Sequence, residues 1–232
     1  MYLFVSFPNN SGSTLMYNLL STSPNASCFK QHKEGHDMCR DFMPHPGKLS
    51  HQPVRTFTEN TDYFQDEKEY DWEMIKKCWH HAWDMKKPIQ LEKSPTNVIK
   101  AKLMSQHLQP SKFILGIRDP RAFVKSLEAF RVKPSDAALH WLRCAETQID
   151  NMKCIEPDRR ILIRYADLCE NPDETCNRLI AFEPQLEVLD WKSLNIKSAN
   201  KSEELSEQSL EDIHSVLDCK SDVLQRFGYE IF

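Results

Sequence analysis

The stretch that decides the fold is FVSFPNNSGSTLMYNLL, residues 4–20. An apolar run begins at Tyr2, a short polar turn contains Gly12, and a helical pattern of apolar residues starts at Thr14. A turn between a buried strand and a helix directs several backbone N–H groups and the positive end of the helix dipole to one point. The segment therefore predicts a phosphate site. A serine-rich helix cap without a ligand is the alternative.

Short β-rich apolar runs alternate with longer helical patterns along the chain. The runs cover residues 2–7, 26–30, 89–92, 113–117 and 161–165, and the helical patterns cover residues 14–21, 98–107, 121–130, 135–153 and 172–182. This alternation is typical of parallel strands joined by crossover helices, and continuously apolar strands are buried on both faces. The sequence therefore predicts a three-layer α/β/α fold with a central parallel sheet.

Composition narrows the class of protein. The 232 residues include only five glycines, carry a net charge of −4, and are 40% hydrophobic and 28% charged. These values exclude a disordered chain and a coiled-coil rod, and they lack the excess positive charge of a general nucleic-acid-binding protein. A single domain over residues 1–232 is expected at this length. The first positive side chain is Lys30, and residues 2–7 are too short for a membrane span, which together predict a cytoplasmic protein.

An insertion, residues 35–88, separates the second and third predicted strands. Residues 43–60 contain three prolines without periodicity and are expected to form an irregular loop. In residues 66–87, Ile75, Trp79 and Trp83 recur at four-residue spacing. This spacing is typical of an amphipathic helix packed on a core, which we favour over an aromatic ligand box.

The first loop differs from that of nucleotide triphosphatases. Their loop has the pattern Gly-x4-Gly-Lys-Ser/Thr, in which the lysine reaches the outer phosphates and the hydroxyl group binds Mg²⁺. Here Ser13 stands in place of the lysine, and no glycine opens the loop. Metal-assisted transfer of a γ-phosphate is therefore disfavoured, and a kinase is kept as an alternative function.

A second strand–turn–helix segment, FILGIRDPRAFVKS, covers residues 113–126. Arg118 lies at the carboxyl end of the predicted strand, where ligands of open α/β sheets bind. Ser126 follows two helical turns later and is expected to face the same ligand. A helix-capping ion pair in the Arg-Asp-Pro sequence is the alternative.

Together the two segments resemble sulfotransferases that use 3′-phosphoadenosine 5′-phosphosulfate (PAPS), with most similarity in style to the tyrosylprotein and bacterial branches. LEKSPTN (residues 91–97), IRYADL (163–168) followed by NPDE (171–174), and FGY (227–229) are similar to later elements of that family, in the same order. The resemblance implies a P-loop kinase-like sheet and a sulfuryl transfer by in-line displacement without a metal ion.

The resemblance also implies roles for individual residues. The loop would bind the 5′-phosphosulfate, Arg118 and Ser126 the 3′-phosphate, and Lys93 would lie near the sulfuryl group. A family loop that closes over the nucleotide is similar to residues 197–201, although a solvated charged loop is the alternative. Tyr165 would contact the adenosine, unless it is a core residue. The expected nucleotide-binding residues are Asn10, Ser11, Gly12, Ser13, Thr14, Arg118, Ser126, Tyr165, Lys197 and Asn200.

Asn10 departs from the family pattern, because a lysine or arginine usually precedes the Ser-Gly of this loop. An amide donates hydrogen bonds to a phosphosulfate oxygen but brings no charge. We expect Lys93 to supply the missing cation. Loss of turnover is the other consequence to consider, and it would leave a nonenzymatic nucleotide-binding module.

The acceptor also needs a general base, and the segment KQHKEGH, residues 30–36, supplies candidates. We favour Glu34, with His36 second and His32 third. A zinc site is a competing reading of this region, with the ligands Cys28, His32, His36 and Cys39. We disfavour zinc because the spacing matches no common finger pattern.

The acceptor itself is not specified by the sequence. We expect the insertion at residues 35–88 to shape its pocket. The aromatic residues and histidines there fit a sugar, a phenol, a peptide tyrosine or a lipid headgroup equally well.

Overall fold

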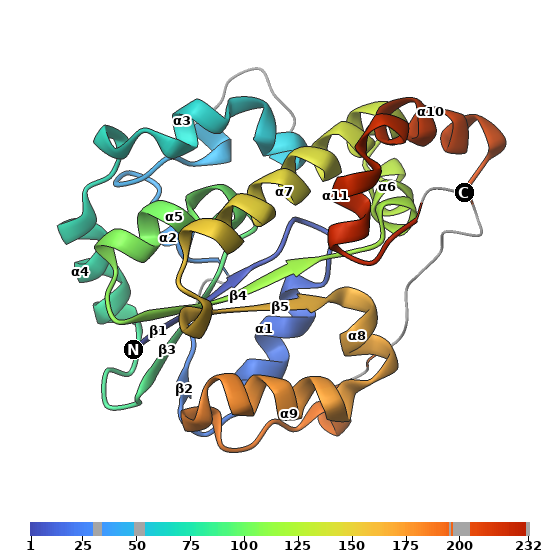
Figure 1. Cartoon of the computed structure of the whole chain (residues 1–232). Coiled ribbons are helices and arrows are strands. Elements are labelled where there is room, and N and C mark those ends of the chain that lie inside the picture. Colours follow the sequence, from blue (N-terminus) through green and yellow to red (C-terminus); the bar gives the residue numbers. More distant parts are fainter. Residues whose placement is uncertain (30–33, 49–53, 195, 197–204, 231–232) are drawn as a thin grey trace.

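In the computed structural model, residues 1–29, 34–48, 54–194, 196 and 205–230 are described. Within them, five strands form one parallel sheet in the order β2-β3-β1-β4-β5 (Figure 1). The strands are β1 (Tyr2–Ser6), β2 (Ala26–Ser27), β3 (Ile89–Lys93), β4 (Ser111–Ile117) and β5 (Arg160–Arg164). The predicted α/β fold with a parallel sheet is confirmed. The second strand is shorter than predicted, and the last ends one residue early because Tyr165 opens a helix.

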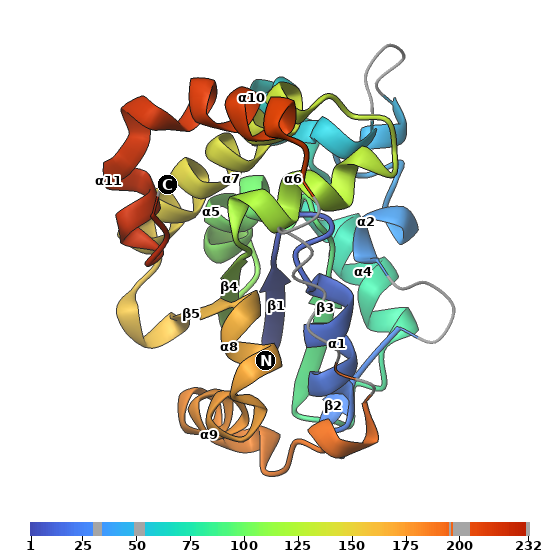
Figure 2. The same ribbon diagram turned by 90° about the vertical axis from the view of Figure 1, so that its right-hand side faces the viewer.

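The strand order places β1 between β3 and β4. Because the strands are parallel, their carboxyl ends meet at one edge of the sheet. The loop after β1 therefore lies between the end of β3, at Lys93, and the end of β4, which Arg118 follows. Figure 2 shows β1 in the middle of the sheet, pointing toward α6 (Pro120–Glu128).

Helices cover both faces of the sheet, as the continuously apolar strands predict. Leu3 and Val5 pack on one face with α1 (Ser13–Ser21), α8 (Tyr165–Glu170) and α9 (Pro172–Phe182). Tyr2 and Phe4 pack on the other face with α4 (Trp72–Ala82) and α5 (Asn97–His107). The alternation follows from the two-residue period of a strand. The long helix α7 (Pro134–Cys154) also lies on the second face (Figure 1).

A third apolar cluster lies at the carboxyl edge, where α6 and α7 meet two C-terminal helices. These are α10 (Glu207–Leu217) and α11 (Ser221–Arg226), which contribute Ile213, Leu217, Val223 and Leu224. Neither helix is predicted from the sequence. Both helices pack on α6 and α7.

The insertion contains more structure than the sequence predicts. Short 3-10 segments at Pro46–Lys48, Val54–Asn60 and Glu67–Glu69 and short helices α2 (Gly35–Met38) and α3 (Thr61–Gln65) precede α4. Residues 43–60 are therefore not one irregular loop. The predicted core helix is confirmed but shorter, because Asp71 caps it at the N–H of Met74. Trp79 and Trp83 are 1% and 5% exposed, as core packing requires.

None of the helices in the described part of the chain is long and apolar enough to cross a membrane.

Candidate active site

The polar turn after β1 forms a tight loop at the amino end of α1. Asn10 and Gly12 have left-handed backbone angles, with φ of 55° and 91°. The ring of Tyr165 lies against Gly12, and a Cβ atom at this position would come within 2.3 Å of its Cδ2 atom. The first four N–H groups of an α-helix have no acceptor within the helix and form the positive end of its dipole. The loop therefore suits an anion, and its turn requires glycine at position 12.

Asn10 uses its polar groups to join two segments of the protein. Its Nδ2 atom donates to the carbonyl oxygen of Ser126 in α6 at 3.2 Å. Its own carbonyl oxygen accepts from Nη1 of Arg118 at 2.8 Å. Asparagine is one of the few residues besides glycine that adopt the left-handed conformation readily. Backbone shape and this bridge explain an asparagine here, where the family resemblance leads one to expect a cation.

Arg118 follows β4 directly and is 6% exposed. The carbon at the centre of its guanidinium group lies 4.7 Å from the ring centre of Tyr165. The backbone carbonyl oxygen of Arg118 accepts from Nε1 of Trp141 at 2.8 Å. Burial lowers the pKa of Arg118, but arginine remains charged in proteins. The helix cap that the Arg-Asp-Pro sequence offers as an alternative is formed by Asp119, which accepts from the N–H of Arg121.

The other predicted nucleotide-binding residues of this loop and of α6 differ in hydrogen bonding and in solvent exposure. The hydroxyl group of Ser126 donates to the carbonyl oxygen of Phe123 in its own helix at 2.6 Å. Ser11 and Ser13 are buried, whereas Thr14 is exposed. Lys197 and Asn200 lie outside the described residues.

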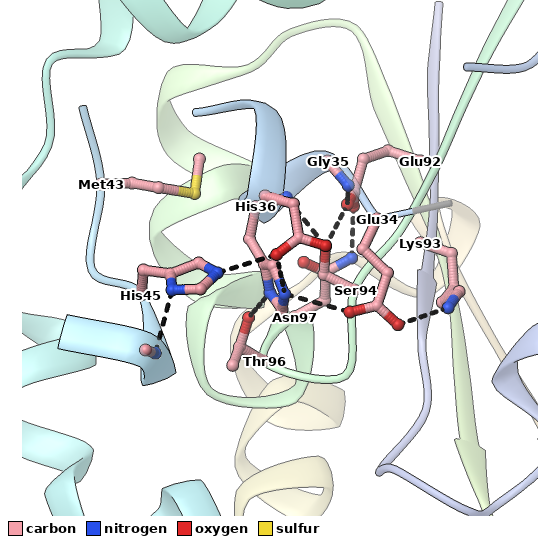
Figure 3. Close-up of polar contacts among 12 residues, drawn as sticks. Glu34, Gly35, His36, Met43, His45, Glu92, Lys93, Ser94, Thr96 and Asn97 are labelled. Atoms are coloured by element: carbon pink, nitrogen blue, oxygen red, sulfur yellow. Dashed lines mark hydrogen bonds and ion pairs between the residues drawn. The ribbon is translucent and has the colours of Figure 1, made fainter. Parts of the chain in front are cut away.

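The predicted catalytic residues meet at the end of β3 (Figure 3). Nζ of Lys93 lies 2.7 Å from Oε1 of Glu34. Nε2 of His36 lies 3.0 Å from Oε2 of the same carboxylate. Lys93 is 2% exposed, and His36 is 6% exposed. Glu34 and Lys93 are 59 positions apart in the sequence, and the parallel sheet brings them together.

These contacts determine the protonation of Glu34. Burial raises the pKa of its carboxyl group, but the hydrogen bond with His36 and the charge of Lys93 outweigh burial and lower the pKa to about 2. Glu34 is therefore ionised in this arrangement and has one oxygen on each partner. A carboxylate held in this way gains basicity when the charge of Lys93 is drawn toward another anion.

Sequence reasoning missed the residues that support His36. Its Nδ1 atom lies 3.0 Å from Oγ1 of Thr96, and its backbone N–H donates to Oγ of Ser94 at 3.1 Å. Both belong to residues 91–97, in which only Lys93 received a role. The available signal was the run of polar residues directly after a buried strand, at the edge where ligands bind.

His36, Asp37 and His45 place potential metal ligands within 4.8 Å of one another. However, Nδ1 of His45 accepts from the N–H of Gly47 at 2.9 Å, so the ring proton is on Nε2. That nitrogen lies 2.9 Å from Oδ1 of Asp37, to which it donates. Burial lowers the pKa of His45 and favours this neutral form. The contacts therefore favour a hydrogen-bonded cluster, since a metal would need Nε2 without its proton.

The zinc alternative drawn from the sequence is not supported by this geometry. Cys28 packs with the cluster on the α1 face of the sheet, whereas Cys39 belongs to the cluster on the α4 face. Burial raises the pKa of Cys39, which opposes the thiolate form that zinc requires. His32 lies outside the described residues.

Comparison with known proteins identifies the family. A family model described as "Sulfotransferase family" matches residues 3–183. The chain belongs to the sulfotransferase family. Among curated proteins, none matches the chain.

Solved structures agree with this sulfotransferase assignment at the level of the fold. The sulfotransferase domain from the curacin biosynthetic pathway is 18% identical with a TM-score of 0.54, over 100% of this chain and 98% of that domain. The sulfotransferase domain of the Synechococcus PCC 7002 olefin synthase is 16% identical with a TM-score of 0.60, over 100% and 95%. A sulfotransferase from Alicyclobacillus acidocaldarius is 14% identical with a TM-score of 0.56, over 97% and 94%.

Proposed function

We propose that this sulfotransferase moves a sulfuryl group from PAPS to a hydroxyl or amine acceptor. The observation that carries the proposal is the chain of contacts from Lys93 through Glu34 to His36, at the end of the strand beside the phosphate loop. The loop offers backbone donors, but Ser13 replaces the lysine that a triphosphatase would use. Lys93 would then supply the positive charge next to the transferred sulfuryl group.

The binding of the donor nucleotide would use the segments on both sides of β1. Gly12, Ser13 and Thr14 would bind the 5′-phosphosulfate through their N–H groups, and Ser11, whose N–H donates to the carbonyl oxygen of Pro8 at 3.2 Å, would hold the shape of the loop. Arg118 and Ser126 would bind the 3′-phosphate. Tyr165 would contact the adenosine. The contact of Arg118 with the carbonyl oxygen of Asn10 supports this placement, because it aligns the two anion-binding segments.

In the transfer step, a lone pair of the acceptor forms a bond to sulfur while the bond from sulfur to the bridging oxygen of the nucleotide breaks. The electron pair of that bond and its negative charge stay on the nucleotide phosphate. Lys93 would donate to this oxygen, and Glu34 would take the acceptor proton. As Lys93 turns to the developing charge, Glu34 loses its cation and becomes a stronger base. His36 would hold the second carboxylate oxygen, and it is our second candidate for the base.

Residues 35–88 would shape the acceptor pocket within a single domain. The segment begins with α2, whose first residue, Gly35, directly follows the proposed base Glu34. A sugar, a phenol, a peptide tyrosine and a lipid headgroup all remain candidate acceptors.

The experiment that tests the function compares two nucleotides and then measures transfer. 3′-Phosphoadenosine 5′-phosphate should raise the melting temperature of the purified chain, with a shift that grows with the logarithm of its concentration above Kd, and ATP with Mg²⁺ should raise it less. Incubation with ³⁵S-labelled PAPS and a panel of the four acceptor classes should then give a labelled product. A larger shift with ATP and Mg²⁺ would favour a kinase. Nucleotide binding without transfer to any acceptor class would favour a binding module.

A further inference from the structure

Glu92 is a buried carboxylate that the proposed reaction does not use. It is 0% exposed and lies next to Lys93 in β3. Its Oε1 atom accepts from the N–H of Gly35 at 3.0 Å and from the hydroxyl group of Ser94 at 2.5 Å. Its Oε2 atom accepts from Nδ2 of Asn97 at 2.5 Å. A buried charge is costly unless hydrogen bonds compensate it, and here both oxygens are bonded.

These bonds hold the backbone of the segment that carries the proposed base (Figure 3). Gly35 lies between Glu34 and His36, and a Cβ atom on Gly35 would come within 2.6 Å of Cγ of Glu92. Ser94 continues the chain of bonds, because its oxygen accepts from the N–H of His36. Two successive N–H groups of the segment are thereby fixed to the end of β3.

Glu92 and Lys93 hold the segment from opposite sides. Successive side chains of a strand point to opposite faces. Glu92 is paired in register with Phe4, whose ring packs on the α4 face, and Lys93 is paired with Val5, which packs on the α1 face. The first residue holds the backbone at Gly35, and the second holds the carboxylate of Glu34.

The bonding pattern at position 92 suits a side chain whose two oxygens both accept hydrogen bonds. The N–H of Gly35 and the amide of Asn97 are both donors, and Asn97 also donates to the carbonyl oxygen of Val5 at 3.1 Å. A glutamine would turn its NH₂ group toward one of these donors. Burial lowers the pKa of Lys100, which is 2% exposed, to about 8, and the nearby charge of Glu92 opposes this shift.

We propose that Glu92 is a positioning residue for sulfuryl transfer, because its carboxylate fixes the backbone at Gly35 and so keeps Glu34 on Lys93. The proposal rests on the proposed function of Glu34 and Lys93. It adds a role for a residue that touches neither donor nor acceptor.

The test compares Glu92→Gln with Glu183→Gln. Glu183 is also a buried glutamate, and its ion pair with Lys112 lies at the opposite end of the sheet. We expect Glu92→Gln to lower kcat about 10- to 100-fold through misplacement of the base, with KM for PAPS little changed. Glu183→Gln should leave kcat unchanged. Equal effects of the two variants on kcat would overturn the proposal.

A second readout does not depend on activity. The carboxyl carbon of Glu34, followed by NMR as pH is varied, should titrate near 2 in the wild type and closer to the ordinary value of about 4.3 in Glu92→Gln. A loss of kcat that leaves the pKa of Glu34 near 2 contradicts the proposal. If the wild type transfers no sulfuryl group, the proposed function fails, and the titration alone decides the role of Glu92.

Ser94→Ala provides a milder variant if Glu92→Gln does not fold. It removes one donor to Glu92 and the acceptor of the His36 N–H, and it adds no new polar group. The pKa of Glu34 should rise in this variant as well, and kcat should fall by a smaller factor. A pKa and a kcat equal to those of the wild type would overturn the proposal.

Discussion

Nη1 of Arg118 donates to the carbonyl oxygen of Asn10 at 2.8 Å, so the segment after β4 is joined directly to the loop after β1. The join orients a buried, charged guanidinium group beside the loop before any nucleotide is bound. It also means that Arg118 has two effects to separate, one on the shape of the loop and one on the 3′-phosphate.

Arg118→Met separates these effects when two nucleotides are compared by calorimetry. A charge-assisted hydrogen bond contributes about 1.5–3 kcal/mol, so affinity for 3′-phosphoadenosine 5′-phosphate should fall about 10- to 100-fold. Affinity for adenosine 5′-phosphate, which lacks the 3′-phosphate, should change much less. Arg121→Met is the matched control, because Arg121 lies in the same turn and pairs with Asp119. Equal losses for both nucleotides would assign Arg118 to loop structure alone.

Gly12→Ala should reduce both stability and nucleotide affinity. The left-handed backbone costs a residue with a Cβ atom about 1–2 kcal/mol, and the methyl group would also meet the ring of Tyr165. Gly228→Ala is the control, since Gly228 has φ of 72° but a Cβ atom there would meet the end of the Arg164 side chain and no residue of the phosphate loop. Chemical unfolding should show a loss in both variants. Nucleotide binding should weaken only in Gly12→Ala, and normal binding in that variant would place the anion elsewhere.

Lys93→Met should abolish most of the transfer activity without unfolding the protein. Loss of a group that stabilises developing negative charge costs about 10²- to 10³-fold in kcat. Affinity for intact PAPS should change less, because the charge on the bridging oxygen develops only as its bond to sulfur breaks. Lys112→Met removes a comparable ion pair, with Glu183, at the far end of the sheet and should keep its activity. Wild-type activity of Lys93→Met would remove Lys93 from the mechanism.

The sequence was most informative where one local rule determines the structure. The continuous apolar runs predicted the five strands, and the parallel order then placed residues 34–36 and Lys93 at one edge. The helices α10 and α11 were missed because their few apolar residues, such as Ile213 and Leu217, gain meaning only against α6 and α7. The prolines of residues 43–60 predict a loop, although buried Phe57 anchors a 3-10 segment there.

In the candidate site, the sequence likewise did not predict individual hydrogen bonds. A glutamate within an apolar strand gives no sign of which donors its two oxygens will meet, so Glu92 received no role. The bridge from Asn10 to Ser126 joins residues 116 positions apart, and it depends on the left-handed backbone at Asn10. Such contacts are set by how elements pack, which neither spacing nor residue type determines.

His140 links the phosphate loop to the insertion and gives a prediction for acid stability. Its Nε2 atom lies 2.9 Å from Oδ1 of Asn9, and its Nδ1 atom lies 2.7 Å from Oγ1 of Thr58. Burial lowers the pKa of His140 to about 3. Between pH 6.5 and 3 the unfolded chain therefore binds a proton that the folded protein does not bind, and stability falls as pH falls through this window.

His140→Gln should remove this dependence and keep a polar side chain at the position. From pH 7 to pH 4.5, the free energy of unfolding of the wild type should fall by about 2–3 kcal/mol more than that of the variant. Urea unfolding at the two pH values measures the difference. Parallel losses in the two proteins would mean that His140 takes up its proton in the folded state over the same range as in the unfolded chain. The contacts with Asn9 and Thr58 would then not hold the neutral ring in place.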